Sequence, residues 1–525
     1  MGVRAPVLLR GYIQTMEKAA AQNPAAKPAE TTFCPEHARR FVLISAILAS
    51  SMGFIDGAVV SLAMPAIRAD LGATLADAQW IINSYLLFLS ALVLLGGAAG
   101  DVFGVRNIFA FGIVVFVITS LACAVAPNAE ALIAMRAAQG VGAALMIPGS
   151  LAIIAKSYPP STRGRAIGQW AAFSSLTTAF GPFLGGMMLS FGTEWMWRLI
   201  FAINGPIGAV ALAMIFWRVP RDRPAASRRL DIPGAVLATV GLGLIAWGLT
   251  GFGLAADEQL GPPWLWLVAG MLILVGFVMW ERRAVAPMVK LELFRSRPFS
   301  GANLFTLILF FAFSAVLFFL PMTLISAWDK QEWEASLAML PLSVAIASLS
   351  GYAGRLADRI GPRLLLTGGA FLVAVAFAGM ALTMPVMSLW AVTVPCVAVM
   401  ALGMALLVSP LSSAVMLATP DADTGLASGI NNAVARAAGL MAVAAMGALA
   451  GVVFSAVADG QLPGLEFGSL LETTLAASDE ALRVSASNRA FQAVAAISSV
   501  MCFGAALIAW LTQPHWRPSE KPTLD

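Results

Sequence analysis

The chain has 525 residues, of which 59% are hydrophobic and only 11% are charged, whereas an average soluble domain carries about 25% charged residues. This composition excludes a soluble globular protein, and the many uncharged runs indicate one polytopic membrane protein. The net charge is +4, but no Lys/Arg cluster with interleaved aromatic residues supports nucleic-acid binding.

Several chemistries are also excluded. The two histidines, His37 and His515, lie outside every apolar run, and the four cysteines have no metal-site or redox spacing. The chain contains no Gly-Lys dipeptide, so the phosphate-binding loop of an ATP-driven pump is absent. We therefore expect no metal, no cofactor and no enzymatic activity.

The apolar runs predict membrane-spanning helices, because a helix of about 20 apolar residues crosses the hydrocarbon core and satisfies its own backbone polar groups. The tail of residues 1–40 precedes the first run and is expected to be cytoplasmic. Fourteen runs predict an all-α membrane protein: 41–65, 79–99, 107–126, 131–154, 166–191, 199–217, 232–252, 263–280, 299–325, 336–354, 364–385, 388–412, 429–456 and 490–512.

The distribution of Lys and Arg predicts the orientation. An even number of spans places both tails on one side of the membrane. If that side is the cytoplasm, 25 of the 32 Lys and Arg residues lie inside, five lie outside and two lie within spans. Cytoplasmic loops are enriched in Lys and Arg, so both termini are predicted to be cytoplasmic in a multi-pass protein of the cell (inner) membrane.

An internal repeat divides the chain. Residues 97–106 between spans 2 and 3 are echoed by residues 354–363 between spans 10 and 11, and residues 142–148 are echoed by residues 403–410. Both shifts are eight helices, and an even shift keeps the orientation, so the repeats are parallel. The predicted regions are a tail (1–40), a six-helix bundle (41–220), a linker with inserted helices 7 and 8 (221–298), a second six-helix bundle (299–512) and a tail (513–525).

These motifs resemble those of the major facilitator superfamily, and within it those of the fourteen-helix drug:proton antiporters. The loop between spans 2 and 3 is similar to the superfamily's gating motif, although valines replace two of its usual arginines, and the second copy matches better. Span 5 resembles the antiporter motif Gly-Pro-x-x-Gly-Gly. The matching residues are Gly97, Asp101, Gly104 and Arg106 in the first copy, Asp358, Arg359, Gly361 and Arg363 in the second, and Gly181, Pro182, Gly185 and Gly186 in span 5.

The resemblance implies proton-coupled efflux of small amphipathic compounds or drugs by alternating access, with a proton gradient as the energy source. A transporter of organic anions or metabolites is the alternative, with Arg136 and Arg436 supplying positive charge. A polytopic membrane enzyme is less well supported, because no histidine and only one Asp lie within the spans. A sensor or a channel is less well supported because two parallel repeats with gating loops favour alternating access.

Only three charged residues lie well inside the predicted spans: Asp56, Arg136 and Arg436. A charge at that depth is costly unless it is paired or wet, so each is a functional candidate. We expect Asp56 to carry the coupled proton and to interact with Arg136, which stays protonated. The alternatives are that Asp56 only accepts hydrogen bonds between helices and that Arg436 is an anchor that snorkels to the interface.

Further polar or aromatic residues are candidates for a substrate cavity, although each is more often a helix-to-helix contact than a ligand contact. They are Asn83, Tyr85, Gln139, Gln169, Trp170, Asn204, Asn303 and Asn432, together with Arg436. The expected partners are the lipid bilayer and a small-molecule substrate. An envelope adaptor protein is a candidate partner for the outer segment 456–489, and the protein is expected to be monomeric.

Overall fold

A computed structural model describes residues 33–190, 194–222, 229–254, 259–420, 423–470 and 475–514, except for the side chains at 58, 172, 175, 176, 178, 179 and 182. Every regular element within these ranges is helical. The first half contains α2 (Glu36–Leu71), α3 (Leu75–Phe103), α4 (Val105–Ala124), α5 (Ala129–Ser157), α6 (Pro160–Ser190), the turn η1 (Glu194–Met196), α7 (Trp197–Ala202) and α8 (Asn204–Arg218).

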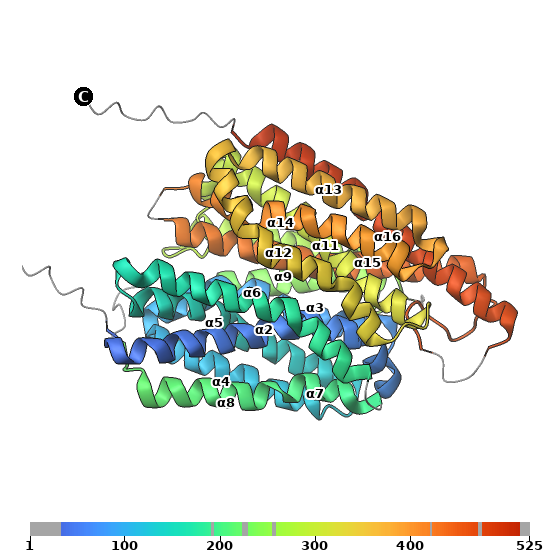
Figure 1. Cartoon of the computed structure of the whole chain (residues 1–525), viewed down its shortest axis with the longest axis horizontal. Helices are drawn as coiled ribbons and strands as arrows, with labels where there is room; N and C mark the ends of the chain where they lie inside the picture. The colour runs from blue at the N-terminus through green and yellow to red at the C-terminus, as the bar shows by residue number, and fades with distance from the viewer. Residues whose placement is uncertain are drawn as a thin grey trace, which may run out of the picture.

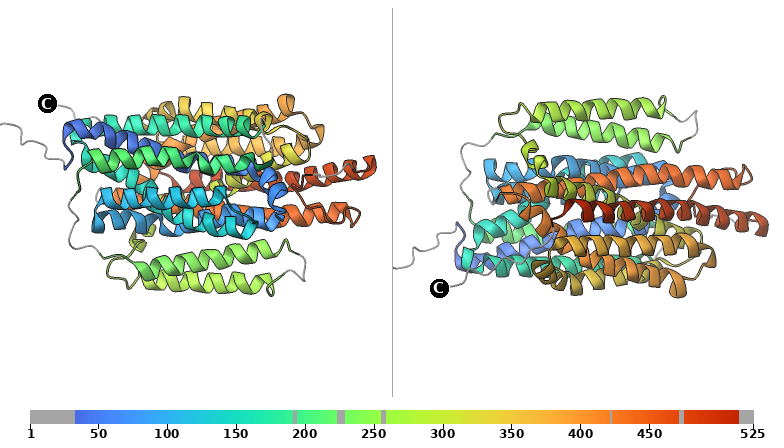
Figure 2. Two further views of the ribbon diagram at one scale, coloured as in Figure 1. Left: turned by 90° about the horizontal axis from the view of Figure 1, so that it is seen from below. Right: turned by 90° about the horizontal axis from the view of Figure 1, so that it is seen from above.

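Two helices and a short turn follow: α9 (Ile232–Gly251), α10 (Pro263–Glu281) and η2 (Leu291–Arg295). Asp231 caps α9 by accepting a hydrogen bond from the amide of Gly234 (3.0 Å), which satisfies one of the free amides of the first turn. Figure 2 shows that α9 and α10 form an antiparallel pair beside the other helices.

The second half contains α11 (Arg297–Ser326), α12 (Glu332–Ile360), α13 (Pro362–Thr383), the turns η3 (Met384–Val386) and η4 (Leu389–Thr393), α14 (Val394–Leu417), α15 (Thr424–Ala458) and α16 (Ala477–Thr512). Several helices extend beyond the apolar runs that predicted them. The largest difference is α16, which begins 13 residues before the predicted span 490–512, because a helix that leaves the bilayer continues with polar residues.

Each predicted apolar run falls mainly within these helices, and span 199–217 is divided between α7 and α8. Within the described ranges, thirteen helices are long and apolar enough to cross a membrane. The helix α6, which holds most of the predicted span 166–191, is not among the thirteen.

Two groups of helices lie side by side along their lengths (Figure 1). The helices α2 to α8 form one group, α11 to α16 form the other, and α9 lies behind their boundary. The helix α2 begins and α16 ends at the same end of the molecule, which we call the terminal end; the other we call the opposite end.

Small residues bring helices together at the repeated motif. A Cβ at Gly142 in α5 would lie 2.6 Å from the amide nitrogen of Phe116 in α4. A Cβ at Gly403 in α14 would lie 2.6 Å from the carbonyl oxygen of Gly369 in α13. The repeated glycines therefore mark equivalent close crossings in the two halves, where membrane helices use small residues to approach closely.

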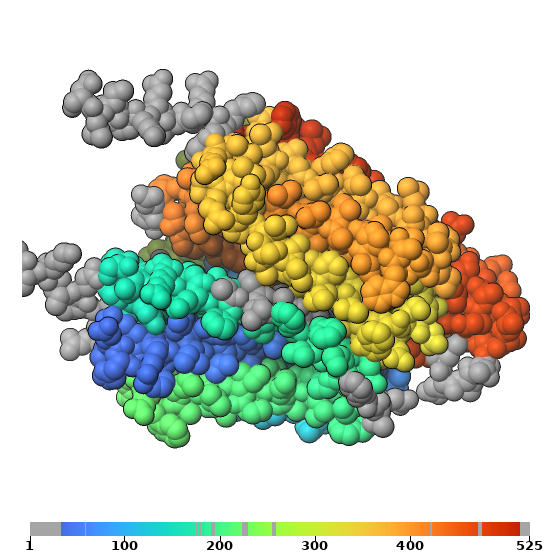
Figure 3. Space-filling view, in the orientation of Figure 1, coloured from blue at the N-terminus to red at the C-terminus, as the bar shows by residue number. Residues whose placement is uncertain are grey.

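The two halves are joined at the opposite end. The amide of Trp333 at the start of α12 donates to the hydroxyl of Ser190 at the end of α6 (3.0 Å). The guanidinium of Arg68 in α2 donates to Glu466 Oε2 (2.8 Å) and to the carbonyl oxygen of Phe467 (2.7 Å) in the segment after α15. At the terminal end α6 and α12 diverge, as Figure 1 and the space-filling view in Figure 3 show.

Candidate functional site

A buried ion pair lies in the middle of the first half. Arg136 Nη1 in α5 donates to Asp56 Oδ2 in α2 at 2.6 Å. Both residues are 1% exposed. Charges that are removed from water are stable only when they are paired and their remaining hydrogen-bonding groups are satisfied, so the surrounding contacts decide how this pair is held.

Gln139 completes the network, because it lies one helical turn after Arg136 on the same face of α5. Its Nε2 donates to Asp56 Oδ1 (3.2 Å), and its Oε1 accepts from Arg136 Nη1 (2.8 Å). Arg136 Nε donates to the carbonyl oxygen of Ile81 in α3 (3.2 Å). Both carboxylate oxygens of Asp56 are thus occupied, and the network connects α2, α3 and α5.

Aromatic rings enclose the guanidinium. The Arg136 Cζ lies 4.3 Å from the ring centroid of Tyr85 in α3 and 5.6 Å from that of Phe201 in α7. Such contacts hold a cation where water is excluded. The carboxylate therefore has a fixed partner that stays charged, and protonation of Asp56 would remove the negative half of the pair.

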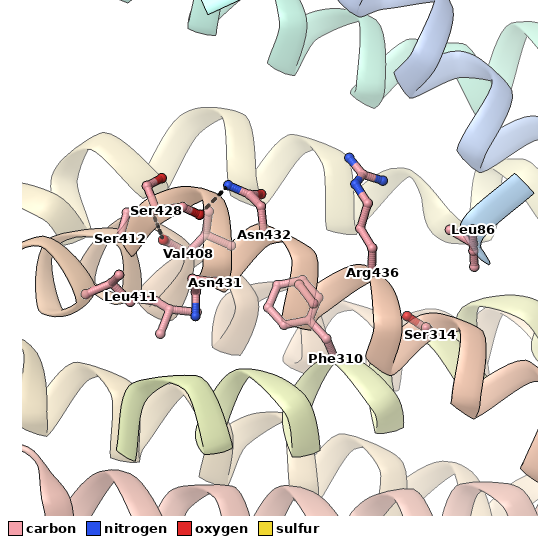
Figure 4. Close-up of a pocket in the computed structure, with 13 residues that line it drawn as sticks. Leu86, Phe310, Ser314, Val408, Leu411, Ser412, Ser428, Asn431, Asn432 and Arg436 are labelled. Atoms are coloured by element: carbon pink, nitrogen blue, oxygen red, sulfur yellow. Dashed lines mark hydrogen bonds between the residues drawn. The ribbon is translucent and has the colours of Figure 1, made fainter. Parts of the chain in front are cut away.

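A cavity of about 320 Å³ lies in the second half, facing α3. Figure 4 shows Asn432 and Arg436 leaving α15 on the same side, one turn apart. Asn431 points away from them, and its Nδ2 donates to Thr306 Oγ1 (2.7 Å) and to Asn303 Oδ1 (3.3 Å) in α11. Asn303 therefore lies behind the cavity wall and orients a residue that lines it.

Of the residues predicted for a substrate cavity, only Asn432 and Arg436 line this one. Gln139 and Tyr85 instead surround the Asp56–Arg136 pair. Asn204 Nδ2 donates to Ser120 Oγ (2.9 Å), which joins α8 to α4 near the break between α7 and α8.

The remaining predicted cavity residues lie elsewhere. Asn83 is fully buried, and neither of its side-chain polar atoms has a hydrogen-bond partner among the described residues. In α6, Gln169 is exposed, and Trp170 Nε1 donates to Ser50 Oγ in α2 (2.9 Å).

The first copy of the gating motif binds the end of α8. The backbone amides of Val105 and Arg106 donate to Asp222 (2.8 and 3.1 Å), and the Arg106 guanidinium donates to the carbonyl oxygens of Val219 (2.9 Å) and Ile215 (3.2 Å). Gly104 has a φ of +92° at this turn, a conformation that side chains other than glycine rarely adopt.

Asp101 of the same motif pairs with Lys156 at the end of α5 (3.2 Å), while Gly97 is exposed with open space around it. In the second copy, Gly361 has a φ of +82°, and the Arg363 guanidinium lies 4.1 Å from the centroid of Trp510. Asp358 and Arg359 are exposed at the terminal end.

The glycines of the span 5 motif face other helices. A Cβ at Gly181 would lie 3.1 Å from Ile55 in α2, and a Cβ at Gly185 would collide with Val59 in α2. A Cβ at Gly186 would lie 2.5 Å from Ser336 Oγ in α12. The motif therefore packs against α2 with one part and against the second half with another. The side chain of Pro182 lies outside the described part of the chain.

Sequence reasoning missed three residues that join elements. Arg68, Asp222 and Glu466 are charged residues in loops or at a helix end. The sequence argument used only Arg68, as part of the Lys/Arg count that predicts the orientation. The sequence signal that could have found Glu466 is weak, because its partner Arg68 is 398 residues away. Within the described ranges, no group of three or more His, Cys, Asp or Glu side chains could hold a metal ion.

The comparisons with known proteins agree with this architecture. The profile of the Major Facilitator Superfamily matches residues 46–444. The chain is 30% identical to the tetracenomycin C resistance and export protein of Streptomyces glaucescens, over 78% of this chain and 75% of that protein. It is 32% identical to the methylenomycin A resistance protein of Bacillus subtilis (strain 168), over 78% of this chain and 87% of that protein.

Solved structures show the same fold. A bacterial homolog of the human lysosomal transporter Spinster, in an inward-facing and occupied conformation, superposes with a TM-score of 0.67 at 15% identity, covering 92% of this chain and all of that chain. The inward-open xylose transporter of E. coli superposes with a TM-score of 0.59 at 15% identity, covering 92% of this chain and 98% of that chain. The chain therefore belongs to the major facilitator superfamily and is a multi-pass membrane transporter.

Proposed function

We propose that the protein is a proton-coupled exporter of small amphipathic compounds that works by alternating access in the cell (inner) membrane. The relatives whose names specify antibiotic export or resistance support the efflux of drug-like compounds. The proposed topology has fourteen spans with cytoplasmic termini, and α6, which holds most of the predicted span 166–191, is one of them. Two six-helix bundles and an inserted helix pair account for these spans.

The Lys/Arg bias assigns the terminal end to the cytoplasm. On this topology, the contacts that join the halves at the opposite end and the divergence of α6 and α12 at the terminal end support an inward-open state. Export then requires the contacts at the opposite end to break while the terminal end closes.

The single observation that carries the proton coupling is the buried Asp56–Arg136–Gln139 network. A proton that binds Asp56 neutralises the carboxylate and weakens its attraction to Arg136, which remains charged. Because the network connects α2, α3 and α5, protonation changes how these helices are held together. The two protonation states of Asp56 then favour different conformations of the transporter.

Proton exchange in proteoliposomes tests this role. We expect a transported dye to dissipate a preset pH gradient with wild-type protein, and Asp56→Asn to abolish the exchange, because Asn cannot bind and release the proton. Asp459→Asn is the matched control: Asp459 is exposed and has a φ of +45°, which Asn tolerates, so exchange should persist. Unaltered exchange in Asp56→Asn would refute the assignment.

A second variant guards against misfolding, since Asp56→Asn leaves the buried charge of Arg136 without its partner. Asp56→Asn combined with Arg136→Gln removes both charges and should restore a monodisperse protein that still lacks proton exchange. Exchange in that double variant would place the proton elsewhere.

A further inference from the structure

The cavity beside α15 contains a positive charge without a counterion. Arg436 is the only charged residue among those that line it, and it has no ion-pair or hydrogen-bond partner among the described residues. A guanidinium at this depth is costly unless water or an anion accompanies it.

The other intramembrane charges do not neutralise it. Asp56 already pairs with Arg136 at 2.6 Å, and Gln139 occupies its second carboxylate oxygen. That pair has no net charge, so the net charge of the three intramembrane residues is the positive charge of Arg436 in the second half.

The rest of the cavity wall combines polar groups with an apolar surface. Asn432 lies one turn before Arg436, and its Nδ2 donates to the carbonyl oxygen of Ser428 (3.1 Å). Ser412 of α14 adds a hydroxyl, and Phe310, Val408 and Leu411 supply an aromatic and aliphatic surface. Figure 4 shows Phe310 beneath the row formed by Asn432 and Arg436.

We propose that Arg436 binds the acidic group of the transported compound, so that the substrates include amphipathic organic acids with a carboxylate. This inference rests on the proposed transport function and specifies its substrate class. A guanidinium binds a carboxylate through two parallel hydrogen bonds, and Asn432, one turn away on α15, has a second amide hydrogen to donate. The apolar body of the compound lies against Phe310, Val408 and Leu411.

Direct binding tests the proposal without requiring proton exchange. The full-length protein in lipid nanodiscs is titrated by calorimetry with three probes of one shape: 2-naphthoate, the neutral 2-naphthamide and 2-naphthylmethylammonium. We expect 2-naphthoate to bind at least tenfold more tightly than either of the others. We expect Arg436→Gln to weaken its binding about tenfold or more, since it removes a charge-assisted bidentate pair.

Matched variants make the result specific. Arg283→Gln removes an exposed arginine outside the cavity and should leave 2-naphthoate binding unchanged. Arg436→Lys keeps the charge but loses the planar fork, so its affinity should lie between those of the wild type and Arg436→Gln. If Arg436→Gln does not give a monodisperse protein, Arg436→Lys and Asn432→Ala provide the comparison.

Equal or tighter binding of the ammonium or the amide would overturn the proposal. So would the absence of 2-naphthoate binding to the wild type, or an affinity that the Arg436 variants leave unchanged. Failure of the proton-exchange test with 2-naphthoate binding intact would refute only the coupling role of Asp56. Loss of the charge preference with proton exchange intact would refute only the substrate class.

Discussion

At the scale of single residues, Asp56 and Arg136 are stable in the membrane interior only together. Their hydrogen bonds with each other and with Gln139 replace water. Removing one member of a buried pair typically costs about 3–5 kcal/mol, because the remaining charge is left without compensation, whereas removing both is often much less costly.

A double-mutant cycle tests this coupling. Asp56→Asn and Arg136→Gln should each lower the free energy of unfolding by about 3–5 kcal/mol, and the double variant should be more stable than either single variant. Denaturant unfolding of the purified protein in detergent measures the effect. If the double variant lost the sum of the two single losses, the residues would not be coupled.

The sequence predicted these residues because depth makes charge conspicuous: Asp56, Arg136 and Arg436 are isolated in apolar runs. It also led us to expect the interaction of Asp56 with Arg136, which is present as an ion pair of 2.6 Å. It could not predict that Arg436 lines a separate cavity, because that depends on how helices pack. Arg68 and Glu466 carried no such signal, since charges at helix ends and in loops are common on either side of a membrane.

At the scale of the elements, the span 5 motif sets how closely α6 approaches α2. A side chain at Gly185 would collide with Cγ1 and Cγ2 of Val59. Val59 is fully packed and β-branched, so its side chain cannot rotate away freely. The glycine is therefore required by the neighbouring helix rather than by the backbone of α6.

Gly185→Ala should lower the free energy of unfolding by about 1–3 kcal/mol, the usual cost of overpacking. Val59→Ala in the same chain should restore most of that stability, because it removes the colliding methyl groups. Thermal unfolding in detergent measures both effects. An additive loss in the double variant would contradict the collision as the cause.

Element boundaries show what hydropathy can and cannot predict. The boundaries of the predicted span 107–126 and of α4 (Val105–Ala124) agree to within two residues at each end. The predicted span 199–217 missed the break at Ile203 between α7 and α8, since apolar content does not reveal where backbone hydrogen bonds are interrupted. The predicted span 388–412 missed the π-helical turn η4 (Leu389–Thr393) before α14 for the same reason.

At the scale of the whole molecule, polar contacts at the opposite end add to the helix packing that joins the two halves. Arg68 is 5% exposed and donates to Glu466 and to the carbonyl oxygen of Phe467. Glu466 also accepts from the amide of Leu75 at the start of α3 (2.6 Å). One carboxylate therefore connects the segment after α15 to both α2 and α3.

Glu466→Gln should favour opening at that end. Hydrogen bonds to charged groups contribute about 1.5–3 kcal/mol, so weakening this set should shift the conformational equilibrium by about tenfold or more. Spin labels at Glu130 and Gln461, both exposed at the opposite end, should report a longer distance. An unchanged distance distribution would show that this carboxylate does not hold the end closed.

The internal repeat in the sequence indicated two parallel halves, but the conformation they adopt follows from contacts that the repeat does not contain. Ser190, Trp333, Arg68 and Glu466 lie outside both copies of the gating motif. The repeat describes each half separately and does not determine which contacts join the two halves.

The most direct test of proton-driven alternating access is double electron–electron resonance in nanodiscs, in a background without the four native cysteines. One pair of spin labels at Gly164 and Tyr352, both exposed, reports on the terminal end, and the pair at Glu130 and Gln461 reports on the opposite end. Asp56→Asn, which keeps the shape of the side chain but carries no charge, should shorten the first distance and lengthen the second relative to the wild type, because Arg136 then has no carboxylate to pair with. Unchanged distances in that variant, or two distances that do not change in opposite directions, would contradict the mechanism.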